Sequence, residues 1–324
     1  MRILDYPSTE VSRKLAEKYG YDEFIVRRWL KFFGDECLKI IEAFERGIPK
    51  YIRVNTIKIR EREVIERLES RGFELRKTEV KYCYEIIREP FSIGATPEFL
   101  MGYYYVMDKS SCIPPLALSP KAGELVVDLA ASPGGKTTFL SQLMDNRGVV
   151  LAIEPQKDRI EALVHNVNRM GAMNVAVLRM DAREFARFMI ESGRKADRVL
   201  LDAPCSGEGI IHKDLSRKRS RGKKDIEFCS YLQRDLILPA FDLLKRGGIM
   251  VYSTCSMTPE ENEFVVEYLL ENRGDAEVIE IPHLPGDPPL DLSEMKKGKI
   301  EFAKRLYPHK HRTSGFFVVK IRKR

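Results

Sequence analysis

The chain has 324 residues, of which 44% are hydrophobic and 32% charged, and its formal net charge is +7. This composition excludes a disordered or fibrous protein, and the length allows two domains or one large domain with an extension. No run of about 18 apolar residues occurs, so no membrane-spanning helix is expected. The positive charge favours an acidic partner such as nucleic acid, although many basic proteins bind none.

The first seven residues contain no apolar core of signal-peptide length, which predicts a cytoplasmic protein in a reducing compartment. The six cysteines show no CxxC spacing, so neither disulfides nor a structural zinc is expected. His309 and His311 supply two ligands without a third, and no metal site is predicted. We expect a monomer.

Residues 1–48 have the pattern of a helical segment. Ser8 or Thr9 can cap a first helix, and a second stretch of helical spacing begins near Asp22 and continues to Phe44. The aromatic side chains of this stripe, including Trp29, are more typical of a core than of a ligand site.

The periodicity changes in the next region, residues 49–108. Residues 51–57 alternate as in a strand, residues 62–72 have helical spacing, and residues 80–87 return to strand. This pattern predicts a small α+β unit of RRM-like type. Basic residues between its elements suit contact with RNA, although the pattern equally fits a small accessory domain.

Residues 109–324 are predicted to form a second domain in which apolar strands alternate with amphipathic helices. Near-continuous apolar strands separated by helices indicate a mostly parallel sheet covered on both faces, which is a Rossmann-like α/β fold. The last strand follows the sixth after a long loop, so we expect an antiparallel edge strand. The seven strands are predicted at 125–129, 149–153, 175–178, 199–201, 249–252, 278–281 and 316–321.

The ends of the first three of these strands carry residues suited to a nucleoside. Glycines within residues 128–138 let backbone approach a ligand at the electropositive start of a helix. Glu154 follows about twenty residues later, where an acidic side chain accepts hydrogen bonds from ribose. Asp181, at the third strand end, is within reach of an adenine amino group. S-adenosylmethionine fits such a pocket, which requires no phosphate.

The run Gly134-Gly135-Lys136-Thr137 also resembles a phosphate-binding loop. The pattern GxxxxGK[ST] requires a glycine where this chain has Ala130. A nucleotide triphosphatase is therefore a less favoured alternative.

Cys205 and Cys255 end the fourth and fifth strands in turns of small residues. If these strands are neighbours, both thiols open into one cleft beside the cofactor. A thiolate that adds to C6 of cytosine makes C5 nucleophilic enough to accept a methyl group, and a base must then remove the C5 proton. Asp202 can hold or protonate the ring at N3. Because the base must be unstacked to enter, this chemistry favours single-stranded or distorted nucleic acid.

A loop that starts just beyond Cys205 is rich in cations. Six of the eight residues 217–224 are basic. Such runs are usually solvated faces, but the position of this one favours contact with phosphates.

The chain resembles the NOL1/NOP2/Sun family of RNA cytosine-C5 methyltransferases over roughly residues 50–324. Residues 128–138 are similar to motif I of that family, Asp-Ala-Pro-Cys-Ser-Gly at 202–207 to motif IV, and Tyr-Ser-Thr-Cys-Ser at 252–256 to motif VI. Residues 53–56 and 108–111 resemble its N-terminal signatures, and residues 305–309 and 315–317 its C-terminal motif.

The resemblance implies a class I methyltransferase domain that uses S-adenosylmethionine and follows an RNA-binding N-terminal region. It assigns Cys255 as the nucleophile and Cys205 as the thiol that assists release, whereas analogy with DNA cytosine methyltransferases would make Cys205 the nucleophile. Lys136 is expected to approach the base. The compact chain looks most like the archaeal members that methylate tRNA, so tRNA is the expected substrate and rRNA is the alternative substrate. A catalytically silent RNA-binding assembly factor is a less favoured alternative function. The implied cofactor contacts are Ala130, Ala131, Ser132, Pro133, Gly134, Gly135, Lys136, Glu154, Arg159, Asp181 and Asp202.

Overall fold

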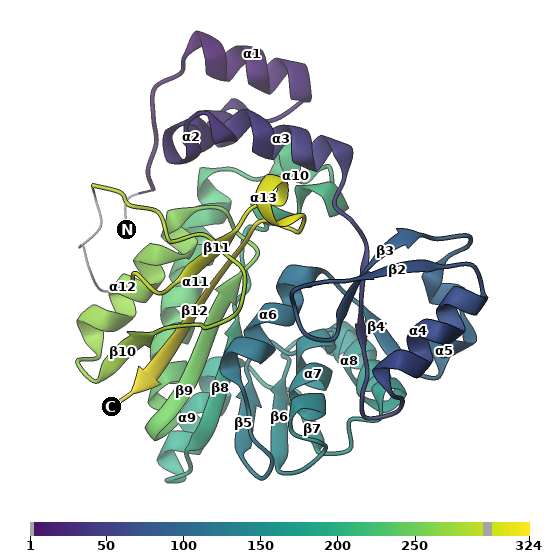
Figure 1. Cartoon of the computed structure of the whole chain (residues 1–324). Helices are drawn as coiled ribbons and strands as arrows, with labels where there is room; N and C mark the ends of the chain where they lie inside the picture. The colour runs from purple at the N-terminus through teal and green to yellow at the C-terminus, as the bar shows by residue number, and fades with distance from the viewer. Residues whose placement is uncertain (1–2, 294–299) are drawn as a thin grey trace.

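A computed structural model describes residues 3–293 and 300–324. The chain opens with a layer of three helices that lies beside the larger sheet domain (Figure 1). Thr9 caps the first helix by accepting a hydrogen bond from the Ser12 amide, and Asp22 caps the second in the same way. Gly34 ends the second helix, so the apolar stripe predicted as one stretch forms two helices. The three are α1 (Glu10–Tyr19), α2 (Glu23–Phe33) and α3 (Glu36–Arg46).

The next region is a small antiparallel sheet in the strand order β2-β3-β1-β4. Val64 and Leu68 of helix α4 pack on Ile52 and Val54 of the central strand β1. The predicted strand-helix-strand unit is present, but β2 and β4 were not predicted because each is very short and neither shows clear alternation. The elements are β1 (Tyr51–Val54), α4 (Glu61–Ser70), β2 (Glu74–Lys77), β3 (Cys83–Arg88), η1 (Ile93–Ala95), α5 (Pro97–Leu100) and β4 (Tyr104–Val106).

The large sheet has the strand order β10-β12-β9-β8-β5-β6-β7, with β11 paired to β12. The five strands from β9 to β7 in this order are parallel. This confirms the predicted Rossmann-like sheet beside a smaller α+β domain. The bounds are β5 (Leu125–Asp128), β6 (Val149–Ile153), β7 (Val175–Leu178), β8 (Ala196–Asp202), β9 (Leu244–Thr254), β10 (Ala276–Ile279), β11 (Lys304–Leu306) and β12 (Phe316–Lys323).

The prediction of an antiparallel edge strand is half wrong. Strand β12 is antiparallel to its neighbours, but it lies between β9 and β10, and β10 forms the edge. The side chains explain the difference: the first four residues of β12 are all buried, which requires cover on both faces, whereas β10 is only four residues long and half-buried.

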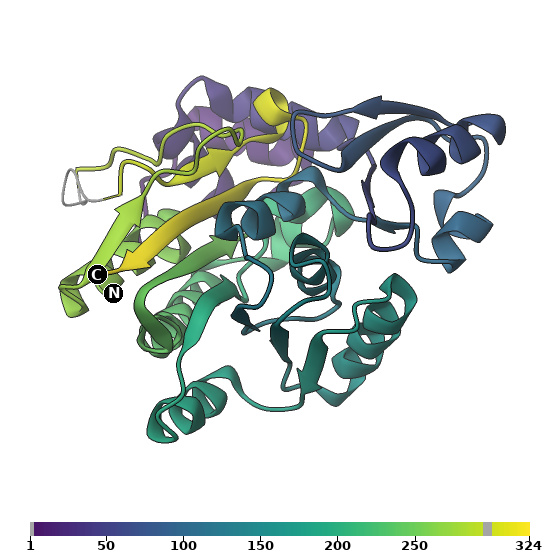
Figure 2. The ribbon, with the colours of Figure 1, turned by 60° about the horizontal axis from the view of Figure 1, so that its bottom comes forward.

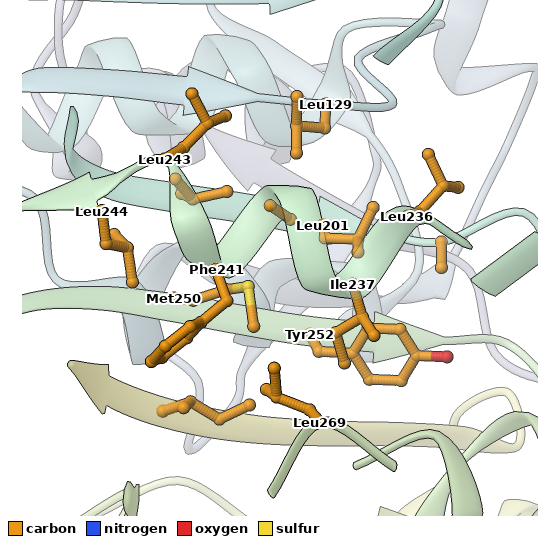
Figure 3. Packing of buried hydrophobic residues seen from close by; sticks show 14 of the residues in the cluster. Leu129, Leu201, Leu236, Ile237, Phe241, Leu243, Leu244, Met250, Tyr252 and Leu269 are labelled. Carbon is orange, nitrogen blue, oxygen red and sulfur yellow. The ribbon is translucent and has the colours of Figure 1, made fainter. Parts of the chain in front are cut away.

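Helices cover both faces of this sheet (Figure 2). On one face Leu236, Ile237 and Phe241 pack against the strand residues Leu201 and Met250 (Figure 3). Among residues 3–293 and 300–324, no helix has the length and apolar character needed to cross a bilayer. The helices are α6 (Lys109–Leu118), α7 (Gly135–Leu143) and α8 (Lys157–Met170) on one face, with α9 (Ala182–Glu191), α11 (Lys223–Asp242) and α12 (Glu263–Asn272) on the other; the short turns are η2 (Glu208–Lys213), α10 (Arg217–Ser220), η3 (Pro259–Glu261) and α13 (Pro308–His311).

Candidate active site

Strands β8 and β9 bring the two cysteines together. The strands are parallel neighbours with Asp202 opposite Ser253, so the turns that follow them lie side by side at the carboxyl edge of the sheet. The Sγ atoms of Cys205 and Cys255 are 3.0 Å apart, and both residues are partly exposed. Two thiols at this distance can share a proton, and both can face one substrate.

A lysine–aspartate pair lies next to the thiols. Lys136, in the first turn of α7, donates a hydrogen bond of 2.6 Å from Nζ to Oδ2 of Asp202. Asp202 Oδ1 accepts a second one, also 2.6 Å long, from the Ser253 hydroxyl. Although burial opposes the charge, the attraction of Asp202 raises the pKa of Lys136, so the ammonium stays protonated.

The two thiols differ in acidity. A hydrogen bond from Cys205 and the nearby positive charge of Lys136 lower the pKa of Cys255, against the effect of its burial. Donating that hydrogen bond raises the pKa of Cys205 well above its usual range, and burial adds to the effect. These opposite directions favour Cys255 as the thiol of the pair that ionises.

Glu261 connects the two cysteine turns. Ser206, which directly follows Cys205, donates its amide N–H to Glu261 Oε2 at 2.9 Å and its hydroxyl to Oε1. Ser256, which directly follows Cys255, donates its hydroxyl to Oε1 at 2.8 Å. One buried carboxylate thus fixes the backbone beside both sulfur atoms.

The acidic stretch that contains Glu261 is not an exposed helix start. Residues 260–263 are all fully buried. Glu260 forms a two-bond ion pair with Arg28 of α2, and Glu263 forms another with Arg305. Sequence reasoning found this stretch only as acidic residues after Cys255. Their partners lie up to 232 residues away in the chain, so no local signal could assign them.

A cavity of about 300 Å³ lies at the carboxyl ends of β5 and β8. The strand order reverses between these two strands, which is where open α/β sheets bind ligands. Small side chains and Gly135 leave this space open, and a Cβ at Gly135 would lie 3.1 Å from Tyr105. The cavity therefore fits a nucleoside cofactor beside Lys136. Its lining is Tyr105, Val106, Met107, Asp108, Ser111, Ala130, Ala131, Ser132, Pro133, Gly135, Lys136, Asp202 and Lys213.

Four other predicted cofactor contacts, Gly134, Glu154, Arg159 and Asp181, do not line this cavity. Glu154 ends β6 as a buried carboxylate; it accepts from the Gln156 amide at 2.9 Å and lies 3.4 Å from Arg159. Arg159 in turn donates to the Ser132 carbonyl, which joins the end of β6 to the motif I turn. Gly134, at φ +103°, begins helix α7. These contacts fix the shape of the turn.

Asp181 has a different environment from the one predicted. It caps α9 and accepts three hydrogen bonds of 2.8–2.9 Å from the amide and guanidinium of Arg183. It lines a separate cavity of about 660 Å³ between α9 and α11. A carboxylate has about four acceptor positions, so contact with an adenine amino group would share this carboxylate with Arg183.

The basic loop is largely bound to the protein itself. Arg217 donates to the Ser206 carbonyl, Lys218 pairs with Glu45 at 2.6 Å, and Arg219 donates to the Gly20 carbonyl. Arg221 lies 3.5 Å from Asp225. These four cations hold the loop against the N-terminal helices and itself, so the predicted phosphate contact is left mainly to Lys223 and Lys224.

The phosphate-loop alternative is not supported by the same residues. A phosphate-binding loop directs its lysine and threonine toward phosphates and a metal ion. Here Lys136 binds Asp202, and the Thr137 hydroxyl donates to the buried carboxylate of Asp128 at 2.7 Å.

Comparison with known families agrees with this geometry. A profile described as 16S rRNA methyltransferase RsmB/F matches residues 115–322, and a profile of the ferredoxin-like domain of RsmF/B-like methyltransferases matches residues 21–88. The chain belongs to the NOL1/NOP2/Sun family of RNA cytosine-C5 methyltransferases. The ferredoxin-like match crosses the predicted boundary at residue 48, and the three predicted domain ranges stay predictions.

Two named relatives have the same sequence identity to this chain. A 28S rRNA (cytosine-C(5))-methyltransferase of Mus musculus is 37% identical over 97% of this chain and 40% of its own length. Ribosomal RNA small subunit methyltransferase F of Vibrio campbellii is 37% identical over 87% of this chain and 59% of its own. The chain thus spans about half the length of these relatives.

Solved structures extend the likeness to the whole fold. A methyltransferase homolog from Pyrococcus horikoshii has a TM-score of 0.86 and 40% identity, covering 98% of this chain and all of its own. NSun6 from Pyrococcus horikoshii, solved with SFG, has a TM-score of 0.81 and 26% identity over 92% of this chain and 97% of its own. The class I methyltransferase fold is confirmed, and so is S-adenosylmethionine as the methyl donor.

Proposed function

We propose that this protein transfers a methyl group from S-adenosylmethionine to C5 of a cytosine in RNA. The observation that carries the proposal is the 3.0 Å approach of Cys205 and Cys255 beside the Lys136–Asp202 pair. Membership of the RNA cytosine-C5 methyltransferase family supports it. The relatives' names assign this chemistry to longer proteins, so it is inferred for this chain.

The residues would divide the chemistry as follows. The Cys255 thiolate adds to C6 of the cytosine, forming a sulfur–carbon bond and moving electron density to C5. Asp202, with a proton received from the Lys136 ammonium, donates to N3 of the ring as negative charge develops there. For release, a base takes the proton of the methylated C5, the electrons of that bond re-form the C5–C6 double bond, and the C6–sulfur bond breaks to return the Cys255 thiolate. Cys205 assists by donating a hydrogen bond to the departing sulfur from its position beside Cys255.

The cofactor supplies the electrophilic methyl group when it is bound. Residues 130–136 would hold it, together with Glu154, Asp181 and Asp202, with Arg159 beside them. Glu154 and Asp181 are acceptors suited to ribose hydroxyls and an adenine amino group.

Two cysteine variants test the division of roles. Cys255→Ala should abolish incorporation of tritiated methyl groups into RNA, because it removes the thiolate proposed to activate C5. Cys205→Ala should form the bond to C6 but release it slowly, so a protein–RNA adduct should accumulate on a denaturing gel. A Cys205→Ala protein that turns over normally without an adduct would contradict the assignment. No incorporation by the wild-type protein on any RNA would favour the catalytically silent assembly factor.

The class of RNA that is methylated is a separate question from the reaction itself. The family resemblance favours tRNA, while the names of the curated relatives favour rRNA, so we propose RNA methylation with tRNA and rRNA as the two substrates to compare. Incubation with unmodified tRNA and with unmodified rRNA, followed by bisulfite sequencing, should show one cytosine position that resists conversion in one of them. The small N-terminal sheet is proposed to contact that RNA. The cytoplasmic location and the monomeric state stay predictions.

A further inference from the structure

Lys213 is a cation in the candidate active site that no step above uses. It ends η2 (Glu208–Lys213), the segment that starts three residues after Cys205. Its side chain is exposed and lines the 300 Å³ cavity together with Lys136 and Asp202. Lys213 therefore adds a positive charge to the cavity on the side of the Lys136–Asp202 pair, which lies next to the two thiols.

Neighbouring cations form ion pairs within the protein, and Lys213 forms none with the residues that the structure describes. Lys136 pairs with Asp202, and Lys109 pairs with Glu79 at 2.8 Å. Across the described residues 3–293 and 300–324, Lys213 has neither an ion pair nor a side-chain hydrogen bond. Its ammonium is thus available to an external anion.

Asp108, an acidic residue that lines the cavity, does not form an ion pair with Lys213. Asp108 is fully engaged: its carboxylate accepts from the hydroxyls of Ser110 at 2.6 Å, Ser314 at 2.9 Å and Thr313. Burial opposes its ionisation, yet the charge of Lys213 and these hydrogen bonds lower the pKa of Asp108. Lys213 is close enough to influence Asp108 without forming an ion pair with it.

We propose that Lys213 binds a backbone phosphate of the RNA beside the cytosine that Cys255 attacks. This rests on the proposed function. An unstacked base enters a pocket while its phosphates stay at the rim, where a lysine ammonium contacts them as a point charge. Such a contact holds the strand in place and carries no sequence information.

Lys213 would bind an anionic oxygen group, and two ligands carry one: the RNA in its phosphates and S-adenosylmethionine in its carboxylate. Binding measurements separate the two sources. Lys213→Ala should weaken RNA binding roughly fivefold to tenfold near 0.1 M salt, and should reduce the slope of log K against log salt by about 0.7 to 1. The affinity for S-adenosylmethionine should be unchanged by calorimetry, and Lys213→Arg should recover most of the RNA affinity.

Lys121→Ala is the matched control. Lys121 is also exposed, but it precedes β5 and lies at the opposite, amino end of that strand. Its loss should leave the RNA affinity and the salt slope at the wild-type values. The phosphate subsite is overturned if Lys213→Ala matches Lys121→Ala, or if it weakens cofactor binding while RNA binding stays unchanged.

Methyl transfer by the wild-type protein on the same RNA is measured in parallel, so that the two proposals can fail separately. An active wild-type protein with an unaffected Lys213→Ala variant refutes the subsite alone. A wild-type protein that binds this RNA but never methylates it refutes the proposed function, whatever the variant does.

Discussion

The turns after β8 and β9 have similar architecture and different electrostatics. Each follows a parallel strand, each places a serine directly after its cysteine, and both serines donate to Glu261. Their surroundings differ: the hydrogen bond with Cys205 and the charge of Lys136 lower the pKa of Cys255, while the pKa of Cys205 is raised. Position alone therefore makes either cysteine a candidate nucleophile, and the surrounding charge distinguishes them.

Removing the charge of Lys136 should remove one of the two contributions that lower the pKa of Cys255. Lys136→Met deletes the ammonium near Cys255 and leaves Asp202 without its ion-pair partner. We expect methyl transfer to fall by about a hundredfold, equivalent to about 2.7 kcal/mol of activation free energy. The pH midpoint for iodoacetamide alkylation of Cys255, followed by peptide mass spectrometry, should rise.

Lys136→Arg is the control for charge without the same geometry, and it should keep the low alkylation midpoint of Cys255. In the wild-type protein Cys255 should react faster than Cys205 below pH 8.5, the usual pKa of a free thiol. Faster alkylation of Cys205 would reverse the assigned roles.

The turns also differ in their buried carboxyl groups. Glu261 receives several hydrogen bonds, whereas Glu208, just beyond the Cys205 turn, is buried and neither carboxyl oxygen has a hydrogen-bond partner in the described residues. Burial raises the pKa of Glu208 to about 8. The folded protein therefore binds a proton that the unfolded chain releases near its ordinary glutamate pKa.

This raised pKa makes stability depend on pH. Its contribution is fully present below the unfolded pKa of about 4.3 and is lost as the pH rises through about 8. From pH 6 to pH 8 the free energy of unfolding should fall by about 2 kcal/mol. Glu208→Gln, which stays neutral, should flatten this fall in urea titrations. An equal fall in both proteins would show that another group is responsible.

Much of this comparison could be predicted from the sequence. Parallel strands end at one edge of a sheet, so apolar strands ending at Asp202 and just before Cys255 predicted that the two turns would be neighbours. The positions of all seven predicted strands followed from their apolar runs, as did the small-residue turn that precedes Lys136.

The parts that could not be predicted depend on distant partners. Glu260 is buried because Arg28 neutralises it across 232 positions of the chain, and an acidic run alone reads as a solvated helix start. The basic loop appeared free for phosphates because Glu45 and the Gly20 carbonyl lie far away in sequence. The place of β12 inside the sheet depends likewise on which neighbours cover it.

The smallest predicted difference concerns the two serines that bind Glu261. Ser206→Ala and Ser256→Ala each remove a buried hydroxyl that donates to Glu261, and the Ser256 hydroxyl also accepts from the Thr258 amide at 3.2 Å. Each lost hydrogen bond should lower the free energy of unfolding by about 1 kcal/mol. Their effects on activity should differ. In Ser206→Ala the backbone N–H of residue 206 still donates a hydrogen bond to Glu261. Ser256, in contrast, binds Glu261 through its hydroxyl, which the Ser256→Ala substitution removes.

Ser256→Ala should therefore loosen the turn that holds Cys255 and reduce kcat severalfold more than Ser206→Ala does. The backbone of the Cys255 turn does not become free, because Asn262 still donates to the Ser256 carbonyl at 3.0 Å. This limits the expected loss to a moderate one. Urea unfolding and single-turnover methyl transfer measure the two quantities separately. Equal kcat values at equal stability would mean that Glu261 supports the fold of both turns without positioning either sulfur atom.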